Sequence, residues 1–461
     1  MQRGGRTGLV TAVVAAVVGA TALGTAHATT GPDRADTPDR IAMPVRVDAS
    51  GRGGAPDRAD ALRRDGATGR AAARGRAGAR DHAATRAALR RAVEAGGLPG
   101  VAAEAQGSKG GWFGSAGFAD TTTQRKRSPA DHFRAASITK PFIATVLLQL
   151  EAEGKLSLDD TVETWLPGVV HGNGYDGSRI TLRHLLNHTS GLFNYTEDTA
   201  FVDQAAGPGF PEHRYDTHTP EELVAVALRH PPVSEPGGKP RYSNTNYILA
   251  GLVIEKVTGR SYAAEATRRI IKPLKLHGTS FPGTSARMPS PHPVGYSRLH
   301  STAPDAPVHD ATEQNMTWLG AAGDLISTTG DLNRFHRALL RGTLLPPAQQ
   351  RAMFDTVEAG GTGYGLGVET ATLSCGVSVV GKSGRTNGSL SAMVGTADGK
   401  RRMTFNINGD WLADSAVYFD IIEAEFCGKA PGTAGRADES TGKGRRALPP
   451  AAVNAMTDPR F

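Results

Sequence analysis

The chain has 461 residues with 57 Gly, 28 Pro and only 6% aromatic residues, which fits one sizeable folded domain with unstructured ends. The formal net charge of +7 suggests a nucleic-acid-binding function, but the basic excess lies at the two ends of the chain. Residues 29–80 carry eleven Arg against seven Asp, and residues 428–461 carry six basic against three acidic side chains. The middle of the chain is slightly acidic, so we expect no nucleic-acid partner.

Residues 1–28 have the pattern of a secretory signal. Arg3 and Arg6 precede an apolar run from Leu9 to Leu23, and Ala26-His27-Ala28 offers small residues for cleavage. A membrane anchor is the alternative reading, but the run is short and rich in Ala and Gly. We therefore expect a secreted protein, found in the cell wall or the medium.

Two further segments lack the apolar residues that a core requires. Residues 29–81 repeat Pro-Asp-Arg-Ala-Asp among Gly, Ala and Arg, which predicts a disordered linker or a removable pro-segment. Residues 429–461 are polar and show no apolar periodicity, which predicts a disordered tail, possibly removed, rather than a membrane anchor. The folded domain should therefore span residues 82–428, and we expect it to be a monomer.

The expected elements follow from apolar periodicity and from Gly and Pro punctuation. In chain order they are a helix over 83–96, strands over 100–106 and 111–117, a helix from Ser137 to Gly154, helices over 181–186, 220–229, 247–259 and 329–340, strands over 377–381, 390–395 and 402–407, and a helix over 413–426. Strands at both ends with a mostly helical insert over 155–330 predict an α+β fold. Its antiparallel sheet should combine N- and C-terminal strands flanked by helices, beside a mostly helical subdomain.

The two cysteines, Cys375 and Cys427, are expected to form one disulfide in an exported protein. Two reduced core cysteines are the alternative. The chain has no Cys/His cluster at metal-ligand spacing, so we expect no metal site and no cofactor.

Ser137 and Lys140 form a Ser-x-x-Lys pair at the start of the helix over 137–154. A lysine one turn after a serine lies on the same helix face, and its amine can activate the hydroxyl as a nucleophile. The same residues could equally be an N-cap and a surface lysine. The pair alone does not decide between a catalytic and a structural role.

Two other short motifs follow in order, Tyr242-Ser243-Asn244 in a loop before a helix and Lys382-Ser383-Gly384 on a strand. Each is weak by itself, because a Tyr-Ser-Asn turn or a Lys-Ser-Gly strand end is common. Together with Ser137 and Lys140, each in its expected structural context, they form the pattern of penicillin-recognising serine acyl-transferases. The chain contains no Gly-x-Ser-x-Gly motif, which disfavours other serine hydrolase classes.

From His82 to Gly428 the chain resembles the class C type of beta-lactamase-related serine hydrolases. Other matching stretches are Leu185-Leu186-Asn187-His188-Thr189-Ser190-Gly191-Leu192, Tyr364-Gly365-Leu366-Gly367, Leu373-Ser374-Cys375-Gly376 and Phe426-Cys427-Gly428-Lys429. Within this family it is most similar to secreted bacterial serine-type D-alanyl-D-alanine carboxypeptidases. The resemblance implies a beta-lactamase/transpeptidase-like fold, peptidoglycan stem peptides or related D-amino-acid peptides as substrates, and beta-lactams as covalent ligands.

The resemblance also implies roles for individual residues. Ser137 would be the acylated nucleophile, Lys140 and Tyr242 would move its proton, and Lys382 would lower the proton affinity of the phenol. The substrate-binding residues would be Asn244, Ser383, Gly384, Arg385, Trp318 and Thr196. The backbone N–H groups of Ser137 and Arg385 would form the oxyanion hole.

One departure from the family concerns the free carboxylate of a terminal D-alanine. The carboxypeptidases read it with an arginine just before the Leu-Ser-Cys-Gly stretch, where this chain has Val368-Glu369-Thr370-Ala371-Thr372. Arg385 shares one side of a strand with Ser383, because side chains alternate with a period of two. We therefore hypothesise that Arg385 clamps the carboxylate. A solvent-facing Arg385 with a changed substrate is the alternative.

Several functions stay open at this point. The favoured one is a penicillin-sensitive D-Ala-D-Ala carboxypeptidase acting through an acyl-serine. A beta-lactamase, an esterase or a D-amino-acid amidase would use the same mechanism. A non-catalytic penicillin-binding or wall-binding module is the third possibility, although it would have no need of the base.

Overall fold

The computed structural model describes residues 82–108, 110–303, 305–359, 362–412 and 416–428. Its helices are α2 (Ala83–Glu94), α3 (Thr139–Ala152), α4 (Val162–Trp165), α5 (Leu182–Leu186), α6 (Thr199–Ala205), α7 (Phe210–His213), α8 (Pro220–Leu228), α9 (Thr245–Thr258), α10 (Tyr262–Ala266), α11 (Gly320–Gly323), α12 (Thr329–Leu340), α13 (Pro347–Phe354) and α14 (Ala416–Cys427). Short 3-10 turns are η1 (Ala136–Ile138), η2 (Gly177–Arg179), η3 (Tyr195–Glu197) and η5 (Met316–Trp318), and η4 (Thr267–Ile271) is a π-helical turn.

Eight strands form one sheet in the order β2-β1-β14-β13-β12-β11-β10-β9, and every neighbouring pair is antiparallel. These strands are β1 (Gly100–Gly107), β2 (Gly110–Gly117), β9 (Val357–Ala359), β10 (Thr362–Tyr364), β11 (Glu369–Thr372), β12 (Ser378–Thr386), β13 (Ser389–Thr396) and β14 (Arg402–Ile407). Two-residue pairs join β3 (Phe133–Arg134) to β8 (Ile326–Ser327), β4 (His171–Gly172) to β5 (Tyr175–Asp176), and β6 (Tyr296–Ser297) to β7 (His309–Asp310). The predicted α+β fold, with N- and C-terminal strands in one antiparallel sheet, is confirmed.

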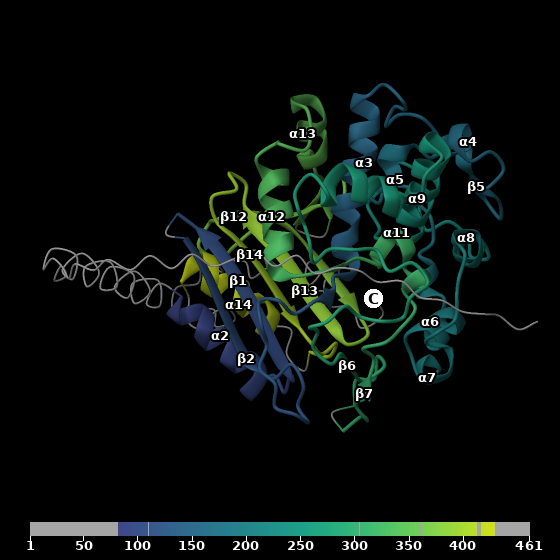
Figure 1. Ribbon diagram of the computed structural model, residues 1–461. Helices are drawn as coiled ribbons and strands as arrows, with labels where there is room; N and C mark the ends of the chain where they lie inside the picture. Colours follow the sequence, from purple (N-terminus) through teal and green to yellow (C-terminus); the bar gives the residue numbers. More distant parts are fainter. Residues whose placement is uncertain (1–81, 109, 304, 360–361, 413–415, 429–461) are drawn as a thin grey trace, which may run out of the picture. The chain divides into compact units, whose positions relative to one another are not determined.

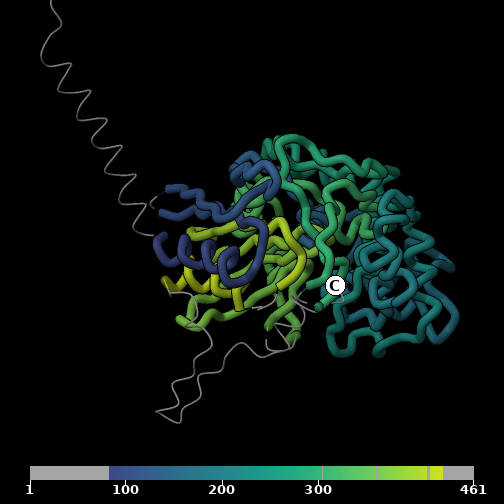
Figure 2. Tube along the Cα trace, turned by 90° about the horizontal axis from the view of Figure 1, so that it is seen from below, coloured from purple at the N-terminus to yellow at the C-terminus, as the bar shows by residue number. Residues whose placement is uncertain are grey.

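One face of the sheet is apolar and is covered by the first and last helices of the described chain. On β14, Met403, Phe405 and Ile407 point to this face, where α2 and α14 pack against it. Figure 1 shows α2 and α14 together beside the sheet, and Figure 2 shows the blue N-terminal part of the described chain next to the yellow C-terminal part. The strand period of two therefore places the apolar residues under helices that are far apart in sequence.

The opposite face of the sheet is more polar and meets the helical part of the molecule. Thr404 on β14 donates a hydrogen bond from Oγ1 to Asn333 of α12 over 3.1 Å. Beyond α12, the helices α3, α9 and α11 pack against one another and form the larger apolar core. Figure 1 shows this helical region, in teal and green, on the side of the sheet away from α2. The active-site segments lie where these two parts meet.

The structure corrects some boundaries. The helix expected to begin at Ser137 begins at Thr139, and Ser137 lies inside the preceding 3-10 turn without capping the helix. The strands β9, β10 and β11 were not expected, because their short sequences show little alternation. No helix among the described residues is long and apolar enough to cross a membrane. The segments 1–28, 29–81 and 429–461, for which the sequence predicts a signal, a linker and a tail, lie outside the described residues.

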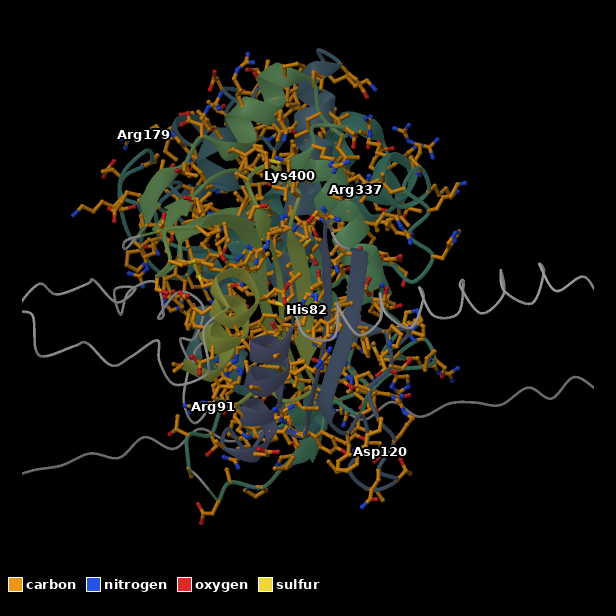
Figure 3. All side chains as sticks on the ribbon, turned by 90° about the vertical axis from the view of Figure 1, so that its left-hand side faces the viewer. His82, Arg91, Asp120, Arg179, Arg337 and Lys400 are labelled. Atoms are coloured by element: carbon orange, nitrogen blue, oxygen red, sulfur yellow. A yellow bond between two sulfur atoms is a disulfide. The ribbon has the colours of Figure 1, made fainter. Side chains whose placement is uncertain are left out.

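Cys375 and Cys427 form a disulfide, as expected, with their Cα atoms 5.8 Å apart. It ties the turn before β12 to the last residue of α14. The same end of α14 is held by His82, labelled in Figure 3, whose Nδ1 lies 2.9 Å from Glu425 Oε2. His82 also stacks on Trp112 of β2 at 4.6 Å between ring centroids. The covalent and non-covalent contacts together hold α14 against the sheet.

Replacing both cysteines with serine should lower the free energy of unfolding without changing the fold. The sequence separation of 52 residues predicts a loss of up to about 4 kcal/mol from loop-closure entropy. Urea denaturation of the double variant and the parent measures this difference. Reduction of the parent with a thiol should reproduce the effect, and an unchanged denaturation midpoint in both cases would contradict the expectation.

Candidate active site

The segment that carries Ser137 is held tightly between the sheet and the helices. On β13, the hydroxyls of Ser389 and Ser391 donate to the carbonyl oxygens of Arg134 and Ala135 over 2.8 and 3.2 Å. The preceding backbone is strained, because Ala136 has a φ of 47°, which non-glycine residues seldom adopt. Such strain persists only where the surroundings over-determine the conformation, and it fixes where the Ser137 side chain points.

Ser137, Tyr242 and Lys140 meet at one point, although Tyr242 is more than a hundred residues away in sequence. Ser137 Oγ lies 2.8 Å from the Tyr242 hydroxyl, and Lys140 Nζ donates to Ser137 Oγ over 3.0 Å. Both partners are within the range that proton transfer to or from the serine hydroxyl requires. The sequence prediction that these motifs converge agrees with this geometry.

Lys140 is fully buried, and its amine has three oxygen neighbours. It donates to Asn244 Oδ1 and to the carbonyl oxygen of Ala322, each over 2.8 Å, in addition to Ser137 Oγ. Burial lowers the pKa of Lys140 well below its usual value, Lys382 lowers it further, and only Glu369 opposes them. When the amine is neutral, its two N–H groups serve Asn244 Oδ1 and the Ala322 carbonyl, and the contact with Ser137 reverses, so that the amine lone pair accepts from the serine hydroxyl.

The ring of His188 packs against the ring of Tyr242 and positions it. In the sequence, His188 lies in a stretch that was noted only because it matches the family. The two rings are 4.4 Å apart between centroids. His188 Nδ1 accepts from the Ser243 backbone N–H over 3.2 Å, and Nε2 lies 3.0 Å from the Tyr364 hydroxyl. Burial lowers the pKa of His188 well below its usual value, so the ring is neutral. It acts as an uncharged support for the phenol.

The third motif lies on β12, where the amine of Lys382 lies near the ring of Tyr242. Lys382 Nζ is 5.2 Å from the centroid of the Tyr242 ring and forms an ion pair with Glu369 on β11. Burial raises the pKa of Tyr242, and Lys382 and the hydrogen bond with Ser137 oppose that rise. A cation beside the phenol therefore favours its ionised form, as the resemblance implied.

Gly384 lets β12 pass the nucleophile segment at close range. A Cβ atom on Gly384 would lie 2.1 Å from the carbonyl oxygen of Ala135. Any side chain there would push the strand away from the serine. The need for glycine in the third motif is thus steric.

A cleft beside Ser137 contains nine of the ten residues that the sequence assigned to the site. Its lining is Ser137, Thr196, Val202, Tyr242, Asn244, His300, Trp318, Leu319, Lys382, Ser383, Gly384, Arg385, Thr386, Leu390 and Tyr418. The tenth, Lys140, lies beneath the cleft and reaches the serine from below. Asn244 connects Lys140 to the cleft wall, because its Nδ2 donates to Thr196 Oγ1 over 3.1 Å.

Arg385 lines the cleft at the far end of β12, on the same strand face as Ser383. Two titratable groups lie near its guanidinium. Burial, with a smaller effect from the charge of Arg385, lowers the pKa of His300 to about 4. Burial raises the pKa of Asp410, and the Arg385 charge acts against that rise. Arg385 therefore belongs to the cleft wall, beside a buried carboxyl group.

Sequence reasoning missed Glu369, His188 and His300 as site residues. Glu369 and His300 lie in stretches that carry no motif by themselves, and His188 sits within a motif whose purpose the sequence does not reveal. Their positions depend on strand register and loop packing, which only the structure supplies. Among the described residues, no group of three or more His, Cys, Asp or Glu side chains is placed to hold a metal ion.

Comparison with known proteins agrees with this geometry. The model of the Beta-lactamase family matches residues 85–414. The crystal structure of a D-stereospecific amidohydrolase from Streptomyces sp. is 52% identical, covers 76% of this chain and 99% of that chain, and superposes with a TM-score of 0.71. D-amino acid amidase from Ochrobactrum anthropi SV3, complexed with L-phenylalanine amide, is 26% identical over 74% of this chain and 97% of that chain, with a TM-score of 0.64.

Penicillin-binding protein 4* of Bacillus subtilis (strain 168) is 32% identical over 257 residues, which is 53% of this chain and 52% of that protein. The chain thus spans about half the length of the curated relatives it matches. The structural relatives are matched over nearly their whole length.

Asp324 is a buried carboxyl group in the segment that supplies the Ala322 carbonyl to Lys140. Its Oδ2 accepts a hydrogen bond from the Tyr262 hydroxyl over 2.6 Å. Burial raises the pKa of Asp324 to about 7, against the opposing effects of Tyr262 and Arg134. The folded chain therefore keeps this proton up to near neutral pH, whereas the unfolded chain releases it at about pH 4.

Between about pH 4 and 7 the folded state binds more protons than the unfolded state, so the free energy of unfolding should fall as pH rises. Asp324→Asn cannot ionise and should escape this fall. Its stability relative to the parent should grow by roughly 3 kcal/mol between pH 5 and 8. Urea denaturation at both pH values measures the change, with exposed Asp203→Asn as control; a pH-independent difference for Asp324→Asn would contradict it.

Proposed function

The chain belongs to the beta-lactamase family of serine hydrolases, and on that premise we propose that it hydrolyses amide bonds on the carboxyl side of D-configured residues through an acyl-serine. The observation that carries the chemistry is the position of Ser137 Oγ within 3.0 Å of both Lys140 Nζ and the Tyr242 hydroxyl. A non-catalytic binding module would not need this arrangement.

In the acylation step, Ser137 Oγ attacks the substrate carbonyl carbon and forms an ester bond as the C–N bond breaks. The serine proton passes through Lys140 and Tyr242 to the leaving amine. The backbone N–H groups of Ser137 and Arg385 stabilise the oxyanion, a device worth about 10²–10³ in rate per donor. Water then attacks the ester carbonyl carbon while Tyr242 takes a proton from the water. The bond between the acyl carbon and Ser137 Oγ breaks, the carboxylic acid leaves, and Tyr242 returns the proton to Ser137 Oγ.

The substrate class is inferred from the family relatives together with this chain's own cleft. The relative matched over nearly its whole length is a D-stereospecific amidohydrolase, which supports a D-configured amide as substrate. The cleft wall offers Asn244 and Thr196 as polar contacts and Trp318 as an apolar one. These side chains would hold the acyl part of the substrate while its amide bond lies over Ser137.

A D-Ala-D-Ala carboxypeptidase is the second candidate, and Arg385 is the observation that favours it. Arg385 lies in the cleft wall, where a guanidinium can form paired hydrogen bonds with the carboxylate of a terminal D-alanine. Peptidoglycan stem peptides would then be the substrates. In both candidates beta-lactams would acylate Ser137 as covalent ligands. Export would depend on the signal sequence that the pattern of residues 1–28 predicts.

The central experiment measures cleavage of acyl-D-Ala-D-Ala, its C-terminal amide and the matching L-configured amide, with a chromogenic cephalosporin in parallel. We expect cleavage of the C-terminal amide of acyl-D-Ala-D-Ala, with little turnover of the L-configured amide or of the cephalosporin. Ser137→Ala should lower kcat/KM by at least about 10³-fold. Rapid cephalosporin turnover with no peptide cleavage would indicate a beta-lactamase instead.

Arg385→Ala separates the two candidates. If Arg385 clamps a carboxylate, the variant should lose at least about tenfold more kcat/KM on the peptide acid than on its amide, because only the acid loses a charged hydrogen bond. Arg179→Ala, at an exposed site outside the cleft, is the control. Equal losses of kcat/KM on the peptide acid and its amide would exclude a carboxylate clamp at Arg385. The amide hydrolase would then be the remaining candidate function.

A further inference from the structure

Glu369 is a carboxylate behind the third motif that the chemistry described so far does not use. It lies on β11 opposite Gly381 of β12, one residue before Lys382. Its Oε1 forms an ion pair with Lys382 Nζ, and its Oε2 accepts from Ser383 Oγ over 3.5 Å. The side chain of Lys382 is 2% exposed and that of Glu369 13%, so water screens the pair weakly.

The basic and acidic side chains that face Tyr242 are Lys140, Lys382 and Glu369. The other titratable groups packed around it are His188, Tyr195, Tyr247 and Tyr364. Burial lowers the pKa of His188 and raises the pKa of each of these tyrosines, so they stay neutral across the working range of pH. The charge balance at the phenol is therefore set mainly by Lys382 and Glu369.

Glu369 and Lys382 act on this balance in opposite directions. Besides the effect of burial, Lys382 lowers the pKa of both Lys140 and Tyr242, and Glu369 raises both. Burial lowers the pKa of Lys382 itself, but Glu369 and Tyr242 outweigh it and keep the lysine protonated. Whichever of Lys140 and Tyr242 is the base, Glu369 makes it harder to deprotonate.

The same pairing affects what can bind beside Lys382. The cleft wall carries two cations, Lys382 and Arg385, and each has a carboxyl group nearby, Glu369 and Asp410 respectively. A substrate carboxylate that approaches Lys382 meets a charge already balanced by Glu369. A neutral amide has no charge that Lys382 could attract, so the Glu369 charge does not weaken its binding.

We propose that Glu369 is a positioning residue that holds Lys382 against Tyr242 and balances its charge, and thereby disfavours substrates whose leaving group carries a carboxylate. This inference rests on the proposed acyl-serine hydrolysis and concerns its leaving-group preference. Glu369 does not line the cleft, so it acts through Lys382 and through its electrostatic field.

Glu369→Gln tests the proposal, because the amide oxygen can still accept from Lys382 while the negative charge is gone. The ascending limb of kcat/KM against pH, measured on the peptide amide, should move to lower pH by about one unit, since both possible bases lose the same neighbouring charge. The ratio of kcat/KM for acyl-D-Ala-D-Ala to that for its amide should rise roughly tenfold. A merely structural role would change neither quantity.

Glu358→Gln is the matched control, because it removes an exposed charge from β9 of the same sheet without touching Lys382. If Glu369→Gln does not fold, the comparison of Lys382→Gln with the double variant Lys382→Gln/Glu369→Gln replaces it, since the glutamate charge is then removed without an unpaired buried lysine. Compared with Lys382→Gln, the double variant should have its ascending limb of kcat/KM at lower pH. It should also have a higher ratio of kcat/KM for acyl-D-Ala-D-Ala to kcat/KM for the amide.

An unchanged limb and ratio, in an enzyme whose wild type cleaves the amide, would overturn the role of Glu369 alone. A wild type that cleaves neither peptide and forms no acyl-enzyme with labelled penicillin would overturn the proposed function, and this inference with it. The wild-type measurement therefore distinguishes a failure of the Glu369 role from a failure of the proposed hydrolysis.

Discussion

The close approach of β12 and β13 to the backbone before Ser137 is the constraint on which the site depends. Gly384 lacks a side chain where a Cβ atom would lie 2.1 Å from the Ala135 carbonyl oxygen, and Ser391 donates to that same oxygen. Through this contact the sheet fixes the distance between Ser137 and Lys382. The helical side supplies Tyr242 and Lys140 to the same point, so neither half of the molecule contains the site alone.

The sequence predicted the chemistry better than its environment. Ser137, Lys140, Tyr242 and Lys382 were recognisable because each lies in a short motif with a definite local structure. Glu369 was named only as part of a stretch that lacks the family's arginine, because its pairing with Lys382 requires the register between two strands. The strand that carries it has four residues, too few to show the period of two. The sheet at large was predictable, since its longer strands alternate clearly.

The burial of charged groups determines the protonation of the two lysines in the site. An amine as deeply buried as Lys140, beside a second lysine, is strongly disfavoured as a cation, and its neutral form can take a proton from the serine. A buried cation at Lys382 is tolerable only with a carboxylate against it, because unpaired buried charges are very unfavourable. The ion pair with Glu369 is thus required by the presence of Lys382, and its influence on substrate choice follows from the same requirement.

The pairing of β1 with β14 joins the beginning of the folded chain to its end. During synthesis, β1 leaves the ribosome with its partner still about three hundred residues away, and β12, β13 and β14 are among the last elements made. Such long-range pairing delays folding. A chain that ends before β12 lacks Lys382 and the strands that position Ser137, so the site cannot be complete before β12 and β13 have been made.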